Sequence, residues 1–343
     1  MKVMKKVATI GLASVMSLGL LTGCGGSKDS SFSSSSDKGE KVYKIGVTQL
    51  VEHDALDASY KGFVAALKDA GYEDGKNIEI DYNNAQNQQD NCQSIASKLV
   101  KNNSDLILAI ATPAAQAVAN ETSSIPILVT AVTDPADAKL VKSNEEPGTN
   151  VSGTSDLTPC KEQMELLTKL LPKAKKVAML YCSAEANSKL QVKMAKEAAK
   201  KLGLETVDAT VADANEIQQV VKSLKGKVDA IYSPTDNTIA NGMTTVSMVA
   251  DEIGIPCIVG EEGMCAAGGL ATYGIDYYKL GEQTGKMAVK VLEGEDISKM
   301  PVEYQEDCEL IINKDAVKKL NITVPKDLDK DARYITTAKK DEK

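Results

Sequence analysis

Hydroxyl side chains follow several predicted strands in the first half of the chain, where they could bind an anion. Thr112, Thr130 and Thr133 each come after or within a short apolar run. A helix predicted to begin near residue 114 would add free backbone N–H groups. Hydroxyls and the N–H groups of a helix N-terminus suit a carboxylate. Alternatively, Thr112 is simply a helix N-cap.

Carboxylates take the corresponding positions in the second half. Asp236, Glu261 and Glu262 follow apolar runs there, and carboxylates suit an ammonium group. Asp236 could instead be a helix N-cap, and the two glutamates could be a solvated pair. An α-amino acid carries both an ammonium and a carboxylate, so the two halves together predict an amino-acid site.

The sequence offers few combinations of residues that could form a catalytic site. The chain has one histidine, His53, which is as consistent with a surface position as with a ligand contact. It contains no Gly-x-Ser-x-Gly elbow and no phosphate-cradling glycine loop. Asp236, Glu261 and Asp276 are the only carboxylates we would nominate for an enzyme. We therefore expect binding without a cofactor or metal, and a secreted enzyme remains the alternative from another class.

The elements that must position these residues alternate regularly in the first half. Short apolar runs predict strands, and stretches with apolar residues at helical spacing predict helices between them. This β-α-β-α order favours a parallel sheet. The strands are expected over 45–47, 77–82, 106–110 and 127–129, and the helices over 57–71, 90–101 and 114–120.

The same order begins again at residue 177, including an Ile-Pro pair before a strand in each half. We therefore expect two doubly wound α/β lobes with a boundary between residues 150 and 158, while one continuous sheet is the alternative. A last strand and helix, 270–275 and 279–293, would suit a chain that returns to the first lobe. The second set of strands is expected over 177–181, 204–209, 229–232 and 257–259, and the helices over 190–202, 215–224 and 243–253.

Composition and charge exclude some classes of partner. With 43% hydrophobic and 26% charged residues among 343, the chain is neither disordered nor a polytopic membrane protein. Its formal net charge is -8, and loss of a leader with three lysines would make it more negative. Nucleic acid is an unsuitable partner, because phosphate binding needs a basic face.

The N-terminus predicts export and lipidation. A basic start is followed by an uncharged run over 7–21 and by small residues before Cys24. The run is short for a membrane span and fits a signal peptide over 1–23. The stretch resembles the lipobox of bacterial lipoproteins, in which Cys24 becomes the lipidated first residue. The alternative is a signal peptide whose cysteine is incidental.

Residues 24–41 are serine- and glycine-rich and predict a flexible tether. The six cysteines beyond it have no metal-ligand spacing, and we interpret most of them as small buried apolar residues. An extracytoplasmic location permits disulfides, but the wide spacing predicts no particular pairing, and Cys257 with Cys265 is the pair to consider.

From about residue 44 to 328 the chain resembles the substrate-binding lipoproteins of ABC transporters, in the group that includes tryptophan/tyrosine-binding proteins. The resemblance rests on long ordered segments. They are IGVTQLVEH (45–53), LILAIATPAAQA (106–117), TAVTDP (130–135), NVSGTSD (150–156), YSPTDNT (232–238), GEEG (260–263) and GIDYYKLG (274–281).

The resemblance implies a type I periplasmic-binding-protein fold, with two Rossmann-like lobes joined by a hinge that closes on its ligand. We expect lobe 1 at 42–155 plus about 277–305 and lobe 2 at 156–276 plus about 306–335. The implied partners are a small molecule and a membrane permease with its cytoplasmic ATPase. A lipid anchor would hold the protein, expected to be a monomer, outside the cell membrane.

The resemblance also implies roles for particular residues. Thr112, Ala131 and Thr133 would bind the carboxylate, and Asp236 or Glu261 would bind the ammonium. Because the chain has no Trp and only 2 Phe, stacking on an aromatic ligand would come from Tyr or aliphatic side chains. Branched-chain amino acids, sugars and nucleosides therefore stay open, as does a sensor module for a membrane receptor. The other expected ligand contacts are Gln49, Glu52, Asn237, Asp276 and Tyr277.

Overall fold

The computed structural model describes residues 41–305 and 307–338. The predicted leader, Cys24 and nearly all of the predicted tether lie outside these residues. No helix in the described part of the chain is long and apolar enough to cross a membrane.

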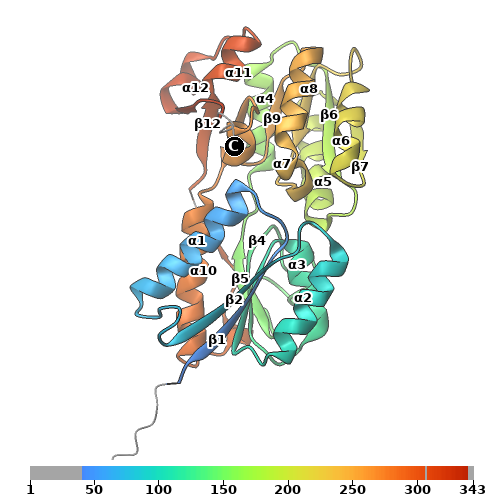
Figure 1. Cartoon of the computed structure of the whole chain (residues 1–343). Coiled ribbons are helices and arrows are strands. Elements are labelled where there is room, and N and C mark those ends of the chain that lie inside the picture. Colours follow the sequence, from blue (N-terminus) through green and yellow to red (C-terminus); the bar gives the residue numbers. More distant parts are fainter. Residues whose placement is uncertain (1–40, 306, 339–343) are drawn as a thin grey trace, which may run out of the picture. The chain divides into compact units, whose positions relative to one another are not determined.

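Two sheets organise the described chain (Figure 1). The first has six strands in the order β11-β5-β4-β3-β1-β2, and the second has seven in the order β13-β12-β10-β9-β8-β6-β7. The strands of the first sheet are β1 (Tyr43–Gln49), β2 (Ile78–Asn84), β3 (Leu106–Ile110), β4 (Ile127–Val132), β5 (Val151–Ser155) and β11 (Glu303–Tyr304). Those of the second are β6 (Lys176–Cys182), β7 (Glu205–Val211), β8 (Ala230–Ser233), β9 (Cys257–Val259), β10 (Ala271–Gly274), β12 (Glu309–Asn313) and β13 (Arg333–Ile335).

Helices cover both faces of each sheet, and we call each sheet with its helices a lobe. The helices of lobe 1 are α1 (Asp54–Asp69), α2 (Gln89–Lys101), α3 (Thr112–Glu121), α10 (Tyr277–Leu292) and the 3-10 turn η2 (Ile297–Lys299). Those of lobe 2 are α4 (Cys160–Leu170), α5 (Ala186–Lys201), η1 (Ala214–Glu216), α6 (Ile217–Lys222), α7 (Asn237–Asn241), α8 (Met243–Ile253), α9 (Glu262–Ala266), α11 (Lys314–Lys319) and α12 (Lys326–Asp331).

The central strands are apolar on both faces because both faces are covered. All residues of β3 and β4 are buried. In β6, Val177 and Met179 pack into one core cluster and the alternating Ala178 and Leu180 into another. Such continuous apolar strands are typical of parallel sheets between two helical layers. The strand pairs are parallel except for β10 with β12.

The chain passes between the sheets three times: after β5, between β10 and α10, and between β11 and β12. Helix α10 packs along α1 and against β4 and β5, which belong to the first sheet. Parallel strands direct their carboxyl ends to one edge of a sheet, so the loops that follow β1, β3, β4, β6, β8 and β9 are the places to look for a site.

Several elements differ from those expected. The helix predicted over 215–224 is the turn η1 followed by the six-residue α6. The five-residue helices α7 and α9 were not expected, because helices this short carry no apolar periodicity. The antiparallel strand β12 was also missed, since its pairing with β10 joins segments that are distant in the sequence.

The six cysteines of the described chain are free thiols, and five of them are buried. This agrees with their interpretation as small apolar residues, and Cys257 and Cys265 are not joined.

Candidate ligand-binding site

At the ends of its central strands, lobe 1 has a buried polar side chain and two residues with strained backbone angles. Gln49 closes β1, and its Nε2 donates to the carbonyl of Val51 at 2.9 Å and to Asp57 Oδ1 at 2.6 Å. Ala111 and Ala131, at the ends of the neighbouring strands β3 and β4, have φ of +80° and +54°. Residues other than glycine adopt such angles at a cost, and the strain is typical of functional loops.

Asp156 is a buried carboxylate directly after β5, and it was not among the residues expected from the sequence. Its Oδ1 accepts a hydrogen bond from Thr133 Oγ1 at 3.0 Å, and its Oδ2 accepts one from the Tyr277 hydroxyl at 2.7 Å. Both partners were expected site residues. The strand β5 that precedes it was not predicted, because its sequence VSGTS is not an apolar run, so Asp156 lacked the strand-end signal of the other residues.

Glu185, after β6, is a second buried carboxylate that was not expected. Its Oε1 accepts from the backbone N–H and the hydroxyl of Thr238, both at 2.9 Å. Its Oε2 accepts from the backbone and side-chain amides of Asn237 at 3.1 and 2.6 Å, and from Asn187 Nδ2 at 3.2 Å. The loop 182–187 follows a predicted strand, which was the available signal.

Asp236 and Glu261 are buried helix N-caps. Asp236 accepts from the N–H of Ile239 and, through its other oxygen, from the Cys182 N–H at 2.6 Å and the Ser188 hydroxyl at 2.7 Å. Glu261 accepts from the two N–H groups that open α9. In both cases capping explains why a short helix begins at this point.

Hydrogen bonds between side chains connect the loops of lobe 1 with those of lobe 2. Two of them end on the first turn of α7, and the third joins the end of β4 to α5. They are His53 Nε2 with Asn237 Oδ1 (3.3 Å), Asn87 Nδ2 to Thr238 Oγ1 (3.1 Å) and Gln191 Nε2 to Thr133 Oγ1 (3.2 Å). The expected residues Thr133 and Asn237 therefore lie where the lobes meet.

Three buried polar atoms at strand ends and helix starts in this region have no hydrogen-bond partner in the described chain. They are Gln49 Oε1, Thr112 Oγ1 and Asn187 Oδ1. Buried polar groups are normally paired, so unpaired ones mark places where a bound molecule would complete the set. Three further atoms of this kind lie in strands: Thr48 Oγ1 in β1, Thr272 Oγ1 in β10 and Ser233 Oγ, which ends β8 as Gln49 ends β1.

Burial raises the pKa of Asp156, Asp236 and Glu261. It raises the pKa of Asp236 to about 8, with the nearby charge of Glu185 as a second cause. It raises the pKa of Glu261 to about 7 against the favourable effect of the two capping N–H groups. The pKa of Asp156 is raised by burial as well, and Glu185 contributes again.

We expect the unliganded chain to lose stability as the pH rises from about 5.5 to 8.5. Acids with a raised folded-state pKa keep protons that the unfolded chain has already released, so their stabilising effect disappears as the pH passes that pKa. Thermal unfolding across this range should show a falling Tm. Asp156→Asn should flatten the slope, and a Tm that rises with pH in the parent chain would contradict the expectation.

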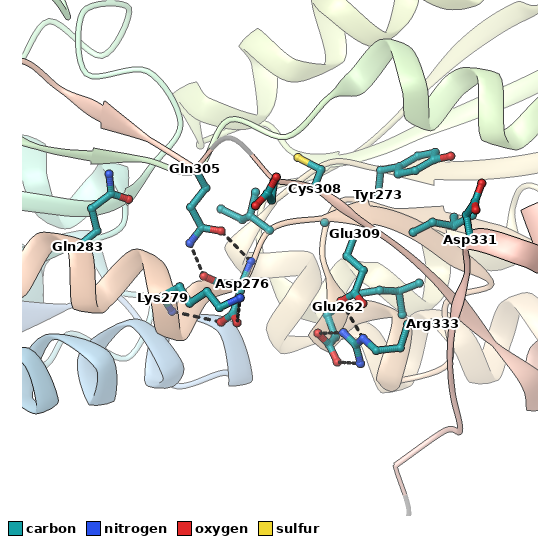
Figure 2. A pocket seen from close by; sticks show the side chains of 15 residues that line it. Glu262, Tyr273, Asp276, Lys279, Gln283, Gln305, Cys308, Glu309, Asp331 and Arg333 are labelled. Carbon is teal, nitrogen blue, oxygen red and sulfur yellow. Dashed lines mark hydrogen bonds and ion pairs between the residues drawn. The ribbon is translucent and has the colours of Figure 1, made fainter.

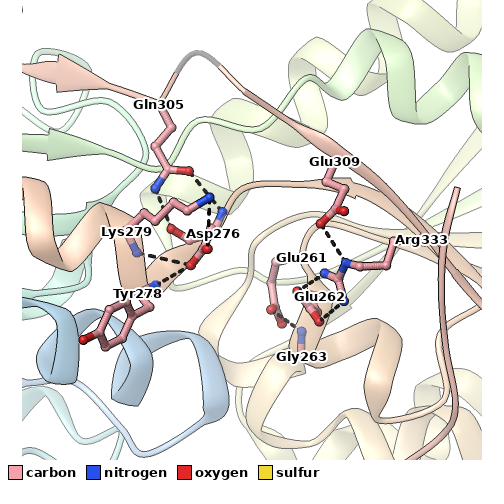
Figure 3. Close-up of polar contacts among 9 residues, drawn as sticks. All are labelled: Glu261, Glu262, Gly263, Asp276, Tyr278, Lys279, Gln305, Glu309 and Arg333. Carbon is pink, nitrogen blue, oxygen red and sulfur yellow. Dashed lines mark hydrogen bonds and ion pairs between the residues drawn. The ribbon is translucent and has the colours of Figure 1, made fainter. Parts of the chain in front are cut away.

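Two expected residues, Glu52 and Asp276, are exposed. Asp276 caps α10 by accepting from the Tyr278 and Lys279 N–H groups (Figure 3). It lines a cavity of about 650 Å³ beside the chain crossings, together with Glu262 and Arg333 (Figure 2). Arg333 binds Glu262 through both guanidinium NH groups there, so Glu262 is paired and is not free for a ligand ammonium.

Comparison with known proteins gives consistent matches over most of the chain. The profile of the family "ABC transporter substrate binding protein" matches residues 44–335. A tyrosine-binding protein of Clostridioides difficile is 48% identical over 320 residues, covering 93% of each chain.

Solved structures agree. The chain resembles an ABC domain from Streptococcus pneumonia in complex with L-Trp, with a TM-score of 0.84 and 40% identity over 86% of this chain and 99% of that one. It also resembles a ligand-free, open substrate-binding protein with adhesive properties from Clostridium difficile, with a TM-score of 0.67 and 49% identity over 87% and 100% of the chains.

These matches confirm the prediction of two parallel-sheet α/β lobes and of a binding protein in place of an enzyme. They also confirm the expected kind of partners, a small-molecule ligand and an ABC permease, and an extracytoplasmic location. The chain belongs to the family of ABC transporter substrate-binding proteins.

Proposed function

We propose that the protein captures an aromatic amino acid, tyrosine or tryptophan, between its lobes and delivers it to a membrane permease. The observation that carries the proposal is the convergence of buried, incompletely paired polar groups from both lobes on the loops where the lobes are hydrogen-bonded. The tyrosine-binding relative and the L-Trp complex support an aromatic side chain.

In this proposal the ligand carboxylate binds to lobe 1 at the N-terminus of α3. Thr112 Oγ1 is buried and has no partner among the described residues. The strained Ala111 precedes it in the chain, and the strained Ala131 follows Thr130, which pairs with Ile110 on the neighbouring strand. Thr133 contributes indirectly, because its hydroxyl already donates to Asp156.

The ligand ammonium is placed near Asp156, whose hydrogen-bond partners in the described chain are two hydroxyls. Glu185, Asp236 and Glu261 form a second layer, because the oxygens of each already accept backbone N–H groups. Gln49, Asn237 and Tyr277 are the proposed polar lining. Glu52 and Asp276, both exposed, are the proposed contacts with the least structural support.

We propose that the two lobes close around the bound ligand and so retain it. A ligand that touches both lobes stabilises the closed state by its differential affinity. The chain superposes more closely on the L-Trp complex than on the open, ligand-free protein, although its sequence identity to the open protein is higher. This difference fits lobes held in a ligand-bound arrangement.

The test is a thermal-shift and calorimetric screen of the mature chain. A ligand at 100 times its Kd should add about 2.7 kcal/mol to the free energy of unfolding. We expect stabilisation by tyrosine or tryptophan, and none by branched-chain amino acids, sugars or nucleosides. Stabilisation by sugars or nucleosides alone would overturn the amino-acid assignment and leave the transport role.

We also propose that Cys24 carries a lipid anchor and that the mature protein is a monomer. Cys24→Ser should move the protein from the membrane fraction to the soluble fraction of cells, because one change removes both cleavage and acylation. Cys308→Ser, which alters an exposed thiol of the folded domain, is the matched control. Membrane association that persists in Cys24→Ser would contradict the anchor.

A further inference from the structure

The buried part of the interlobe site holds four acids that carry negative charge when ionised and that have no protein countercharge in the described chain. Its four acids are Asp156, Glu185, Asp236 and Glu261, each at most 4% exposed. Their hydrogen-bond donors within the described chain are hydroxyls, amides and backbone N–H groups, with no lysine or arginine among them. Buried charges are normally paired, so ionisation of these acids requires a positively charged partner from outside.

Helix N-termini offset only part of this charge. Glu185 and Asp236 both accept N–H groups from the first turn of α7, so two carboxylates share the partial positive charge of one five-residue helix. Asp156 is bound by two hydroxyls alone. His53, which lies near Glu185, adds no positive charge at neutral pH, because burial lowers its pKa.

The hydrogen-bonding groups point to the same kind of partner. Asn187 Nδ2 donates to Glu185, while its Oδ1 is buried and unpaired. Gln49 Oε1 is likewise an acceptor without a donor. Acceptors next to buried carboxylates call for N–H donors with positive charge, and a primary ammonium supplies three.

Resting on the proposed function, we infer that the ligand's ammonium group dominates recognition, so that the site also takes aromatic monoamines that lack a carboxylate. A zwitterionic amino acid brings one positive and one negative charge to the acids of the site, whereas an amine brings only the positive charge that these acids attract. The carboxylate subsite offers an unpaired hydroxyl at Thr112 and no buried lysine or arginine among the described residues. Removing the carboxylate from the ligand should therefore weaken binding less than removing the ammonium.

The test measures the Kd of the mature protein by calorimetry for L-tyrosine and for analogues that each lack one charged group. Tyramine lacks the carboxylate, and 3-(4-hydroxyphenyl)propionate lacks the ammonium. We expect tyramine to bind within about tenfold of L-tyrosine and the propionate to bind at least about 100-fold more weakly. Tyrosol, with a hydroxyl in place of the ammonium of tyramine, is the control that isolates the charge. L-Tryptophan with tryptamine forms a second series.

The outcomes separate the inference from the proposed function. If the amino acids bind and removal of the carboxylate weakens binding as much as removal of the ammonium, the inference fails and the proposed function stands. If amines bind and neither amino acid does, the cation requirement stands and the amino-acid assignment fails. If no member of either series binds, both are overturned.

Discussion

Gly281→Ala is expected to destabilise the folded chain by about 2 kcal/mol or more. This lies in the upper half of the range of about 1–3 kcal/mol that is usual for overpacked contacts. Helices α1 and α10 cross closely at glycines. A Cβ at Gly281 would overlap the backbone carbonyl of Ser59, and one at Gly62 would overlap that of Tyr278. Because the obstructing atoms are backbone, no rotamer change relieves the overlap, and the helices must move apart.

Chemical denaturation of the unliganded protein measures this effect. Gly274→Ala is the matched control, since a Cβ there has no neighbour nearer than 3.5 Å. It should change the free energy of unfolding by less than about 1 kcal/mol. Equal stability of Gly281→Ala and the parent chain would show that α1 and α10 tolerate a wider separation.

The parallel sheets could be predicted because burial on both faces leaves a clear trace in the sequence. The strand expected over 106–110 is β3, and the helix expected over 243–253 is α8. Such elements combine apolar runs or periodicity with local turn signals. Pairings between distant segments leave no such trace, which is why β12 and its partner β13 were missed.

The site could be predicted only in part, for a related reason. Strand-end position identified Thr112, Thr133, Asp236 and Glu261, and the structure buries all four. Residue type does not show whether a buried carboxylate caps a helix or faces a ligand. That distinction depends on donors brought in from other elements, such as the Tyr277 hydroxyl that reaches Asp156 across 121 positions of sequence.

Asp156→Asn is expected to weaken binding of tyrosine or tryptophan by at least about tenfold, because it removes the carboxylate that would pair with the desolvated ammonium of the ligand. The fold should tolerate the change. Both partners of Asp156 are hydroxyls, and a hydroxyl can rotate to accept from the new amide as readily as it donated to the carboxylate. Since burial raises the pKa of Asp156, a neutral side chain costs the unliganded protein little.

Calorimetric titration and thermal unfolding of the same samples separate binding from stability. Glu262→Gln is the control, because its carboxylate is partly exposed and ion-paired with Arg333. The substitution therefore removes one negative charge from lobe 2 and leaves the proposed ammonium contact at Asp156 unchanged. Affinity should then fall in Asp156→Asn alone, with the Tm of its unliganded form unchanged or raised. Equal affinities in both variants and the parent chain would remove Asp156 from the site.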